Sequence, residues 1–298
     1  MDGYKVQDNS YGIADFQSEL LVLLKEFIKI CEKYNLRWWI DSGSLIGTLR
    51  HNGFIPWDDD LDVAMPRPDY EKLWSLRDEV NKNGRFLICR TGEKKNYHHR
   101  VMQLVDTNTT FIHTRSAHED IEHGVYIDVL PIDGRAPTKL GFLNQAFNAS
   151  LYSIYNIQCL PEYNDGKTVG TIVKIALAII QNKHLRYKIW KHCEKRMTRW
   201  DFDKTEYVCQ ICCDTRTMRT PFKSEWVRSV KKHQFEDIEV NIPIGADLFL
   251  RQYFGDYMQL PPEEKRHPVH NTVLIDLEHP YTQYRGKYYC VEKSEDNK

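Results

Sequence analysis

The chain has almost no net charge and no long hydrophobic run. Its 298 residues include 41 Lys and Arg and 42 Asp and Glu, which gives a formal net charge of -1. A balanced chain presents no global positive field, so we expect no nucleic acid partner. The longest apolar run, residues 171–180, contains Lys174 and is too short to span a bilayer. Because no apolar segment opens the chain, we expect neither a signal peptide nor an anchor, and a cytoplasmic location.

A disulfide pattern is also missing. The eight cysteines are scattered, which favours reduced thiols in a cytoplasmic enzyme. One spacing, Cys209-x-x-Cys212-Cys213, is compatible with zinc. The neighbouring Val208 and Ile211 are instead typical of a buried strand, so both interpretations remain open.

Hydrophobic periodicity predicts an α+β protein. Residues 1–135 are expected to form a mixed sheet flanked by helices, and residues 136–298 an α-rich region that completes the active site and its acceptor side. Apolar spacing predicts a helix over Phe16–Tyr34 and mostly helical structure over 139–200. Short apolar runs predict strands at 37–41, 60–65, 86–89, 99–105, 109–113 and 124–130.

The sequence is unusually acidic at one point. Asp58, Asp59, Asp60 and Asp62 crowd into five positions, directly before the apolar run Val63–Met65. Crowded carboxylates raise one another's pKa unless a cation lies among them. On a strand, residues two apart project to the same face, so Asp60 and Asp62 can share one cation while Leu61 enters the core. Oxygen ligands favour Mg²⁺ or Mn²⁺.

A Gly-Ser pair precedes the acidic run. Gly43 and Ser44 follow an expected strand and directly precede an expected short helix over Leu45–Leu49. Glycine lets a ligand approach the backbone closely, and a helix N-terminus offers free N–H groups to phosphate. A phosphate cradle just upstream of a metal-binding carboxylate pair indicates phosphoryl or nucleotidyl transfer.

These two motifs belong to one longer signature. The segment Trp39–Asp62, WIDSGSLIGTLRHNGFIPWDDDLD, resembles the signature of LicD-type phosphotransferases, and HGVYIDVLPIDG at 123–134 resembles a second element of that family. The family is similar to the nucleotidyltransferase superfamily, which implies a nucleotidyltransferase-like core. In such a core Asp128 is the third metal carboxylate, and its place in an apolar run requires a cation or a donor. Asp133, before Gly134, is interpreted as a turn residue.

The resemblance implies a metal-dependent transferase. Its Mg²⁺ or Mn²⁺ would be held by Asp60, Asp62 and Asp128, and Asp128 or Asp60 would help to deprotonate the acceptor. The implied donor is a CDP ester, above all CDP-choline, and the implied acceptor is a hydroxyl of a cell-surface glycan, either free or linked to lipid. CDP-ribitol, CDP-glycerol or aminoalkyl-phosphonate donors, a true nucleotidyltransferase using NTP, and a non-catalytic scaffold are the alternatives.

Further residues are candidates for substrate contacts. Within the signature these are Asp41, Gly43, Ser44, Arg50 and Trp57, with Arg50 as the stronger phosphate partner and Trp57 as either a site wall or a cage for a quaternary ammonium. Outside the signature, Arg100 follows His98 and His99 and is a candidate for the diphosphate or a surface turn residue.

The segment His184–Trp200 is strongly basic with interleaved apolar residues. It is either an exposed helix that covers the core or an interfacial helix that lies on an anionic membrane leaflet. Peripheral membrane contact through residues 183–200 would suit a lipid-linked acceptor.

Overall fold

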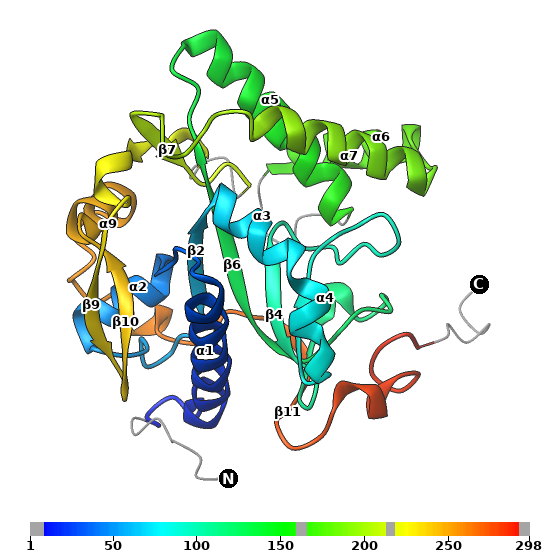
Figure 1. Cartoon of the computed structure of the whole chain (residues 1–298). Coiled ribbons are helices and arrows are strands. Elements are labelled where there is room, and N and C mark those ends of the chain that lie inside the picture. The colour runs from blue at the N-terminus through cyan, green and yellow to red at the C-terminus, as the bar shows by residue number, and fades with distance from the viewer. Residues whose placement is uncertain (1–8, 159–165, 213–217, 292–298) are drawn as a thin grey trace.

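The computed structural model describes residues 9–158, 166–212 and 218–291 (Figure 1). Its centre is a mixed sheet in the order β1–β2–β6–β4–β3, with β7 on β6 and β8 on β7. The strands are β1 Trp39–Ile40, β2 Asp62–Pro66, β3 Phe86–Cys89, β4 Met102–Asp106, β6 Val125–Gly134, β7 Tyr207–Cys209 and β8 Phe222–Lys223. Only β2 and β6 pair in parallel among these strands. The predicted α+β fold with a mixed sheet is confirmed.

Helices pack on this sheet because their apolar residues recur at helical spacing. Helix α1 spans Ala14–Tyr34, buries Leu20, Leu24 and Phe27, and packs on β6 and β4. It ends where Asn35 adopts a left-handed conformation. After β2 the chain forms two consecutive helices, α3 Arg67–Ser75 and α4 Arg77–Val80, and then the short 3₁₀ turn η1 Asn81–Asn83.

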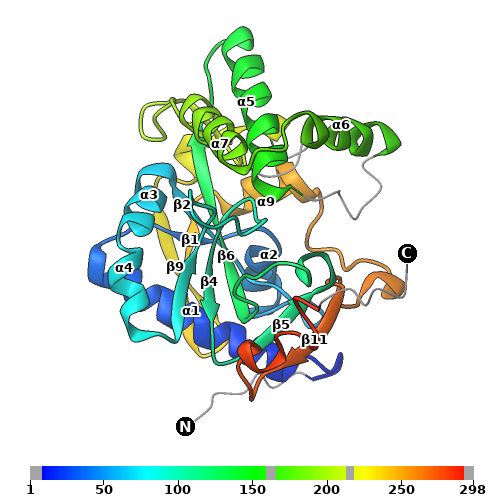
Figure 2. The same ribbon diagram turned by 90° about the vertical axis from the view of Figure 1, so that its right-hand side faces the viewer.

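Three helices gather at one end of the molecule, as both views show (Figures 1 and 2). They are α5 Lys139–Ile157, α6 Gly166–Ile179 and α7 Lys183–Met197. Tyr152 of α5 stacks on Trp190 of α7 with ring centroids 5.6 Å apart, and both side chains are buried. The expected helical stretch over 139–200 is therefore confirmed where it is described. In the described part of the chain, no helix combines the length and the apolar character that crossing a membrane requires.

The remaining segments return to the core rather than forming a separate helical body. Strands β9 Val230–Phe235 and β10 Ile238–Pro243 form a hairpin, and β10 lies beside β1. Strand β11 Thr272–Asp276 pairs with β5 Thr110–His113, and α9 Ala246–Phe254 packs on the helix that follows β1. Short 3₁₀ turns complete the chain at η2 Thr114–Ser116, η3 Ser224–Trp226, η4 Glu263–Lys265 and η5 Tyr281–Tyr284. The boundary between residues 135 and 136 stays a prediction.

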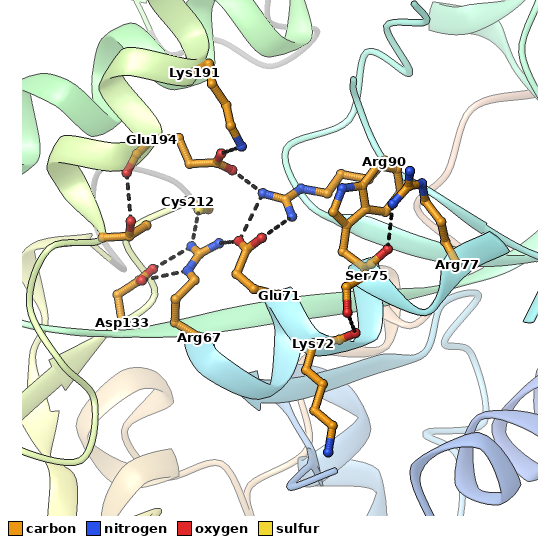
Figure 3. A network of polar contacts seen from close by, with 12 residues as sticks. Arg67, Glu71, Lys72, Ser75, Arg77, Arg90, Asp133, Lys191, Glu194 and Cys212 are labelled. Carbon is orange, nitrogen blue, oxygen red and sulfur yellow. Dashed lines mark hydrogen bonds and ion pairs between the residues drawn. The ribbon is translucent and has the colours of Figure 1, made fainter. Parts of the chain in front are cut away.

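Asp133 is not the turn residue that its place before Gly134 predicted. It lies inside β6, is fully buried, and accepts hydrogen bonds of 2.8 and 2.7 Å from Nε and Nη2 of Arg67 (Figure 3). Strand β6 continues past Asp133 because β7 pairs with it there. Local turn chemistry was therefore overridden by a long-range strand pairing and a buried ion pair.

The Arg67–Asp133 pair belongs to a network that joins the sheet to the helical end. Arg67 also pairs with Glu71, which in turn binds Arg90, and Arg90 binds Glu194 of α7 (Figure 3). Arg67, Arg90, Asp133 and Glu194 are all buried. Each charge therefore has an opposite charge beside it.

The cysteine segment contributes to the same region. Cys209 and Cys212 are buried thiols, and Nη2 of Arg67 lies 3.2 Å from Sγ of Cys212. Cys213, the third member of the predicted zinc spacing, lies outside the described residues. Among the residues that are described, no cluster of three or more His, Cys, Asp or Glu is arranged to hold a metal ion.

Candidate active site

Two of the predicted metal carboxylates lie side by side on the sheet. Asp62 opens β2 and pairs in parallel register with Asp128 of β6, whose backbone N–H donates to the carbonyl of Leu61 at 3.0 Å. Asp60 lies in the segment before β2 rather than on the strand itself. Leu61 is buried as expected. The alternation of Asp60 and Asp62 around Leu61 thus persists although the strand begins later than predicted.

The carboxylates in this cluster oppose one another's ionisation. Burial raises the pKa of Asp62 well above its ordinary value, and the charges of Asp60 and Asp128 raise it further. Burial likewise raises the pKa of Asp60 to about 6. The pKa of Asp128 is raised by burial, although a hydrogen bond from Gln103 acts in the opposite direction. Each side chain keeps some exposed surface, so it combines a dense protein environment with access to solvent.

A divalent cation fits the chemistry of these residues. Carboxylate oxygens are the ligands that Mg²⁺ and Mn²⁺ prefer, and a cation would remove the repulsion that raises these pKa values. The three side chains are close enough to interact electrostatically. Because the described residues contain no ready-made coordination group, binding would have to draw these carboxylates together.

The Gly-Ser motif lies against the carboxylates. Helix α2 spans Ser42–His51, so Gly43 and Ser44 form its first turn instead of preceding it. The hydroxyl of Ser44 accepts a hydrogen bond of 3.0 Å from the backbone N–H of Asp62. A Cβ at position 43 would lie 3.1 Å from Oδ2 of Asp58. The positive end of α2 therefore lies beside the acidic cluster.

The backbone is strained where this helix begins. Ser42 has a φ of +52°, which residues other than glycine rarely adopt. Such strain costs of order 1–3 kcal/mol and persists only where the surroundings enforce it, commonly at functional sites. It occurs here at the residue that places Gly43 and Ser44 against the carboxylates.

Asp41 is held from two parts of the chain. It is buried and accepts hydrogen bonds from Nε1 of Trp39, Oγ of Ser42 and Nε2 of Gln210. Burial raises its pKa to about 6, although these hydrogen bonds act to lower it. Gln210 follows β7, so the second half of the chain reaches the start of α2.

Asp59 pairs with a histidine that the sequence did not indicate. Its carboxylate accepts hydrogen bonds from the backbone N–H of His270 at 3.0 Å and from that ring's Nδ1 at 2.9 Å. Burial raises the pKa of Asp59, but His270 more than compensates and the net shift is downward. Burial lowers the pKa of His270, and Asp59, Asp60 and Asp128 together raise it above its ordinary value. His270 therefore sets a cationic ring beside the cluster when it is protonated.

The sequence-predicted Arg50 and Trp57 each contact a residue from the second half of the chain. Nη1 of Arg50 donates to the carbonyl of Tyr257 at 2.7 Å. Burial lowers the pKa of Arg50, and the charge of Asp58 acts to raise it. The ring of Trp57 has the guanidinium of Arg266 5.7 Å from its centroid, so it already contacts a cation.

The His98–Arg100 segment contributes a buried histidine. His99 lies 3.1 Å through Nδ1 from Nε2 of Gln103, which donates to Oδ1 of Asp128 at 2.8 Å. The structure thus links His99 to the cluster through Gln103. Arg100 is anchored through its carbonyl, which accepts a hydrogen bond of 2.8 Å from Tyr152. A phosphate-binding role for Arg100 stays a prediction.

Comparison with known proteins identifies the family of this site. Residues 35–146, which contain α2, the acidic run and Asp128, match the family model described as LicD/FKTN/FKRP, nucleotidyltransferase domain. The chain carries a domain of the LicD type. The resemblance found in the signature is therefore confirmed, and this LicD-type chain is a phosphotransferase.

Named relatives extend the likeness beyond the matched domain. The LicD-type chain is 26% identical over 259 residues to the lipopolysaccharide cholinephosphotransferase LicD of Haemophilus influenzae, covering 84% of this chain and 92% of that protein. It is 36% identical over 50 residues to the human ribitol 5-phosphate transferase FKRP, covering 17% of this chain and 10% of that protein. The first relationship spans both halves of the chain, and the second is confined to a short segment.

Three polar residues around the LicD-type carboxylates were missed in the sequence. Gln103 carried a signal, because it is a polar residue inside an apolar strand and pairs in register with Asp128. Gln210 and His270 arrive from distant segments, and nothing in their local sequence indicates Asp41 or Asp59 as partners. The roles of the predicted site residues stay predictions.

Proposed function

We propose that this enzyme transfers phosphocholine, or a similarly substituted phosphate, from a CDP-activated donor to a hydroxyl of a cell-surface glycan and releases CMP. The observation that carries the proposal is the parallel pairing of Asp62 with Asp128 beside the N-terminus of α2. A metal-binding carboxylate set beside a phosphate cradle suits transfer of a phosphoryl group. The likeness to a lipopolysaccharide cholinephosphotransferase over most of both chains supports this donor and acceptor class.

The residues divide the work of the transfer. The acceptor oxygen attacks the distal phosphorus of the donor diphosphate, the bond from that phosphorus to the bridging oxygen breaks, and CMP leaves. Asp128 or Asp60 takes the proton of the acceptor hydroxyl. The N–H groups at the start of α2 would bind phosphate oxygens. Mg²⁺ or Mn²⁺ held by Asp60, Asp62 and Asp128 would offset the charge that develops on the leaving phosphate.

Product analysis tests the reaction. Incubation with CDP-choline, Mg²⁺ and a glycan acceptor is expected to release CMP in step with transfer, and EDTA is expected to stop both. CDP-ribitol and CDP-glycerol serve as competing donors. Release of pyrophosphate from CTP, with no CMP from any CDP ester, would refute the proposal.

The same assay distinguishes this reaction from the principal alternative, nucleotidyl transfer from an NTP. The matched family model is described as a nucleotidyltransferase domain, which favours attack at the α-phosphorus of an NTP as a second candidate. The same carboxylates can serve either reaction, because each reaction breaks a phosphoanhydride bond of a nucleotide substrate. The identity of the leaving group separates them.

The choline headgroup has its own test at Trp57. A quaternary ammonium has no N–H donor and is bound by aromatic faces. If Trp57 contacts it, Trp57→Ala should weaken CDP-choline binding more than CMP binding, by about 0.5–2 kcal/mol. In that case choline would contact a ring that Arg266 already contacts. Equal losses for both ligands, measured by calorimetry, would assign Trp57 a structural role.

A further inference from the structure

The helical end of the molecule has a charge unlike the rest of the chain. From 166 to 200 there is one acidic residue, Glu194, and it is buried in the network with Arg90. The basic residues of that stretch are Lys167, Lys174, Lys183, Arg186, Lys188, Lys191, Lys195, Arg196 and Arg199. The whole chain is nearly neutral, so positive charge is concentrated in this stretch. Its exposed basic side chains are Lys174, Lys183, Lys188, Lys191, Lys195, Arg196 and Arg199.

An apolar stripe lies on the neighbouring helix. Leu140, Leu143 and Phe147 of α5 are 80%, 55% and 62% exposed. Their spacing places them on one face of the helix, and Leu151 continues the same stripe. Three large side chains projecting from one helix face are not the scattered single exposures of an ordinary surface.

The apolar and basic side chains meet in one groove. A groove of about 570 Å³ runs between α5 and α7. Its lining includes Phe147 and Leu151 from α5 and Lys188, His192 and Arg196 from α7. Nη2 of Arg196 lies 3.5 Å from Oδ1 of Asn144, so the two helices are in contact along it. We name this surface, from Leu140 to Leu151 on α5 and from Lys188 to Arg196 on α7, the α5–α7 face.

We propose that the α5–α7 face docks on the surface of an anionic lipid bilayer. The exposed leucines and Phe147 would enter the boundary between headgroups and acyl chains, while the flanking Lys and Arg meet the lipid phosphates. No exposed acidic side chain in the described part of 139–200 opposes that contact. The charge complementarity thus favours an anionic membrane.

This surface differs from the membrane helix that the sequence suggested. Trp190 and Met197 of α7 are buried against the protein, so they are not available to a bilayer. The apolar contribution comes instead from α5, with the charge from α7. None of these residues belongs to the carboxylate cluster, and the proposal does not depend on which donor the enzyme uses.

Vesicle flotation of the full chain tests the proposal. Vesicles of phosphatidylcholine with about 30% phosphatidylglycerol are compared with pure phosphatidylcholine vesicles. We expect binding to the anionic vesicles alone, and at least a ~10-fold weakening when NaCl rises from about 0.1 to about 0.5 M. Equal binding to both vesicle types, or none to either, would overturn the proposal.

Paired variants locate the surface. Leu143→Ser with Phe147→Ser, and separately Lys188→Gln with Arg196→Gln, are each expected to weaken anionic-vesicle binding at least ~10-fold. Leu248→Ser on α9 and Lys231→Gln on β9, both exposed, are matched controls that should bind like wild type. A variant counts as folded if its thermal unfolding matches that of wild type. If the double variant at 143 and 147 does not fold, the two single substitutions are measured in its place. Retained binding in folded α5 variants would refute the assignment.

Two further measurements separate rival outcomes. Light scattering shows whether the α5–α7 face instead pairs two copies, and a dimer that Phe147→Ser dissociates would overturn the proposal. CMP release with a water-soluble acceptor should be unchanged in the surface variants. Failure of that reaction in the wild type would count against the proposed chemistry alone, because flotation measures docking without turnover.

Discussion

Strand β6 carries two clusters of charged side chains that are built in opposite ways. Around Asp128 the neighbours Asp60 and Asp62 have the same sign, and burial with mutual repulsion raises their pKa values. Further along the strand, Asp133 faces Arg67 at 2.7 Å. Burial raises the pKa of Asp133 too, but the guanidinium of Arg67 lowers it. Among the described residues none forms an ion pair with Asp60, Asp62 or Asp128, although His270 lies near them, whereas Asp133 is paired with Arg67.

This difference distinguishes a functional site, the carboxylates around Asp128, from a structural ion pair, Asp133 with Arg67. A buried charge that is paired and hydrogen-bonded can persist as part of the fold, and its loss leaves the partner uncompensated. A crowded group of like charges destabilises the fold. Such groups cluster at functional sites, where they serve a role such as cation binding. We therefore expect substitutions at Asp133 to affect stability and substitutions at Asp62 to affect turnover.

The largest expected effect is on stability at the paired cluster. Asp133→Asn leaves the Arg67 charge buried without its main partner and should lower the free energy of unfolding by about 3–5 kcal/mol. Asp237→Asn, the same change in the half-exposed pair with Lys25, should cost about 0–1 kcal/mol. Urea unfolding measures both. Similar losses of stability in the two variants would show that the buried Asp133–Arg67 pair stabilises the fold no more than the surface pair does.

Substitutions in the unpaired cluster, which consists of Asp60, Asp62 and Asp128, should lower turnover. Asp62→Asn is expected to lower kcat by about 10²–10³-fold or more, because charge stabilisation at the transferring phosphate is lost. The metal-free variant should be at least as stable as wild type, since a repulsive charge has been removed. Asp78→Asn, at a side chain 85% exposed, is the control. Wild-type turnover in a folded Asp62→Asn protein would remove Asp62 from the site.

Gly47 tests the support of the phosphate cradle. A Cβ at this position would lie 2.5 Å from the carbonyl oxygen of Gly53, so Gly47→Ala forces α2 away from the chain that leads to the acidic run. We expect a loss of roughly 1–3 kcal/mol in the free energy of unfolding. Gly92→Ala, where a Cβ meets open space, should be nearly neutral. If thermal melts show equal stability for both variants, the close approach is unimportant.

Stability of the metal-free protein should depend on pH through the carboxyl groups of Asp41 and Asp60. The pKa values of Asp41 and Asp60 are about 6, against 3.8 for the ordinary group. The folded state thus binds protons more tightly, and this contribution is present below about pH 4 and lost as pH rises through about 6. Between pH 7 and pH 5 we expect a gain of at least about 1 kcal/mol, or ~2–4 °C in Tm. Asp41→Asn should reduce this slope, and an unchanged slope would mean that other groups cause it.

The sequence predicted best what depends on local pattern. The long helix α1, the short strands and the helical stretch after Thr138 follow from the spacing of apolar residues, and their structures agree with that spacing. The approach of Asp62 to Asp128 was predicted from the family resemblance, and the parallel pairing of β2 with β6 provides the structural cause.

What the sequence did not predict depends on long-range contacts. Asp133 has the local pattern of a turn, but the pairing of β6 with β7 and the guanidinium of Arg67 place it inside a strand. His270 and Gln210 reach the site from segments far away in the chain. No periodicity reports such contacts, because they depend on how the second half of the chain folds back.

The most direct test of the central claim is Mn²⁺ binding by the full chain, measured by electron paramagnetic resonance at neutral pH with CDP present. We predict that wild type binds Mn²⁺, that Mg²⁺ displaces it, and that Asp62→Asn weakens binding at least ~10-fold while Asp78→Asn leaves it unchanged. Equal Mn²⁺ affinity in wild type and a folded Asp62→Asn protein would contradict the account, because the unpaired carboxylates would then not be the metal site.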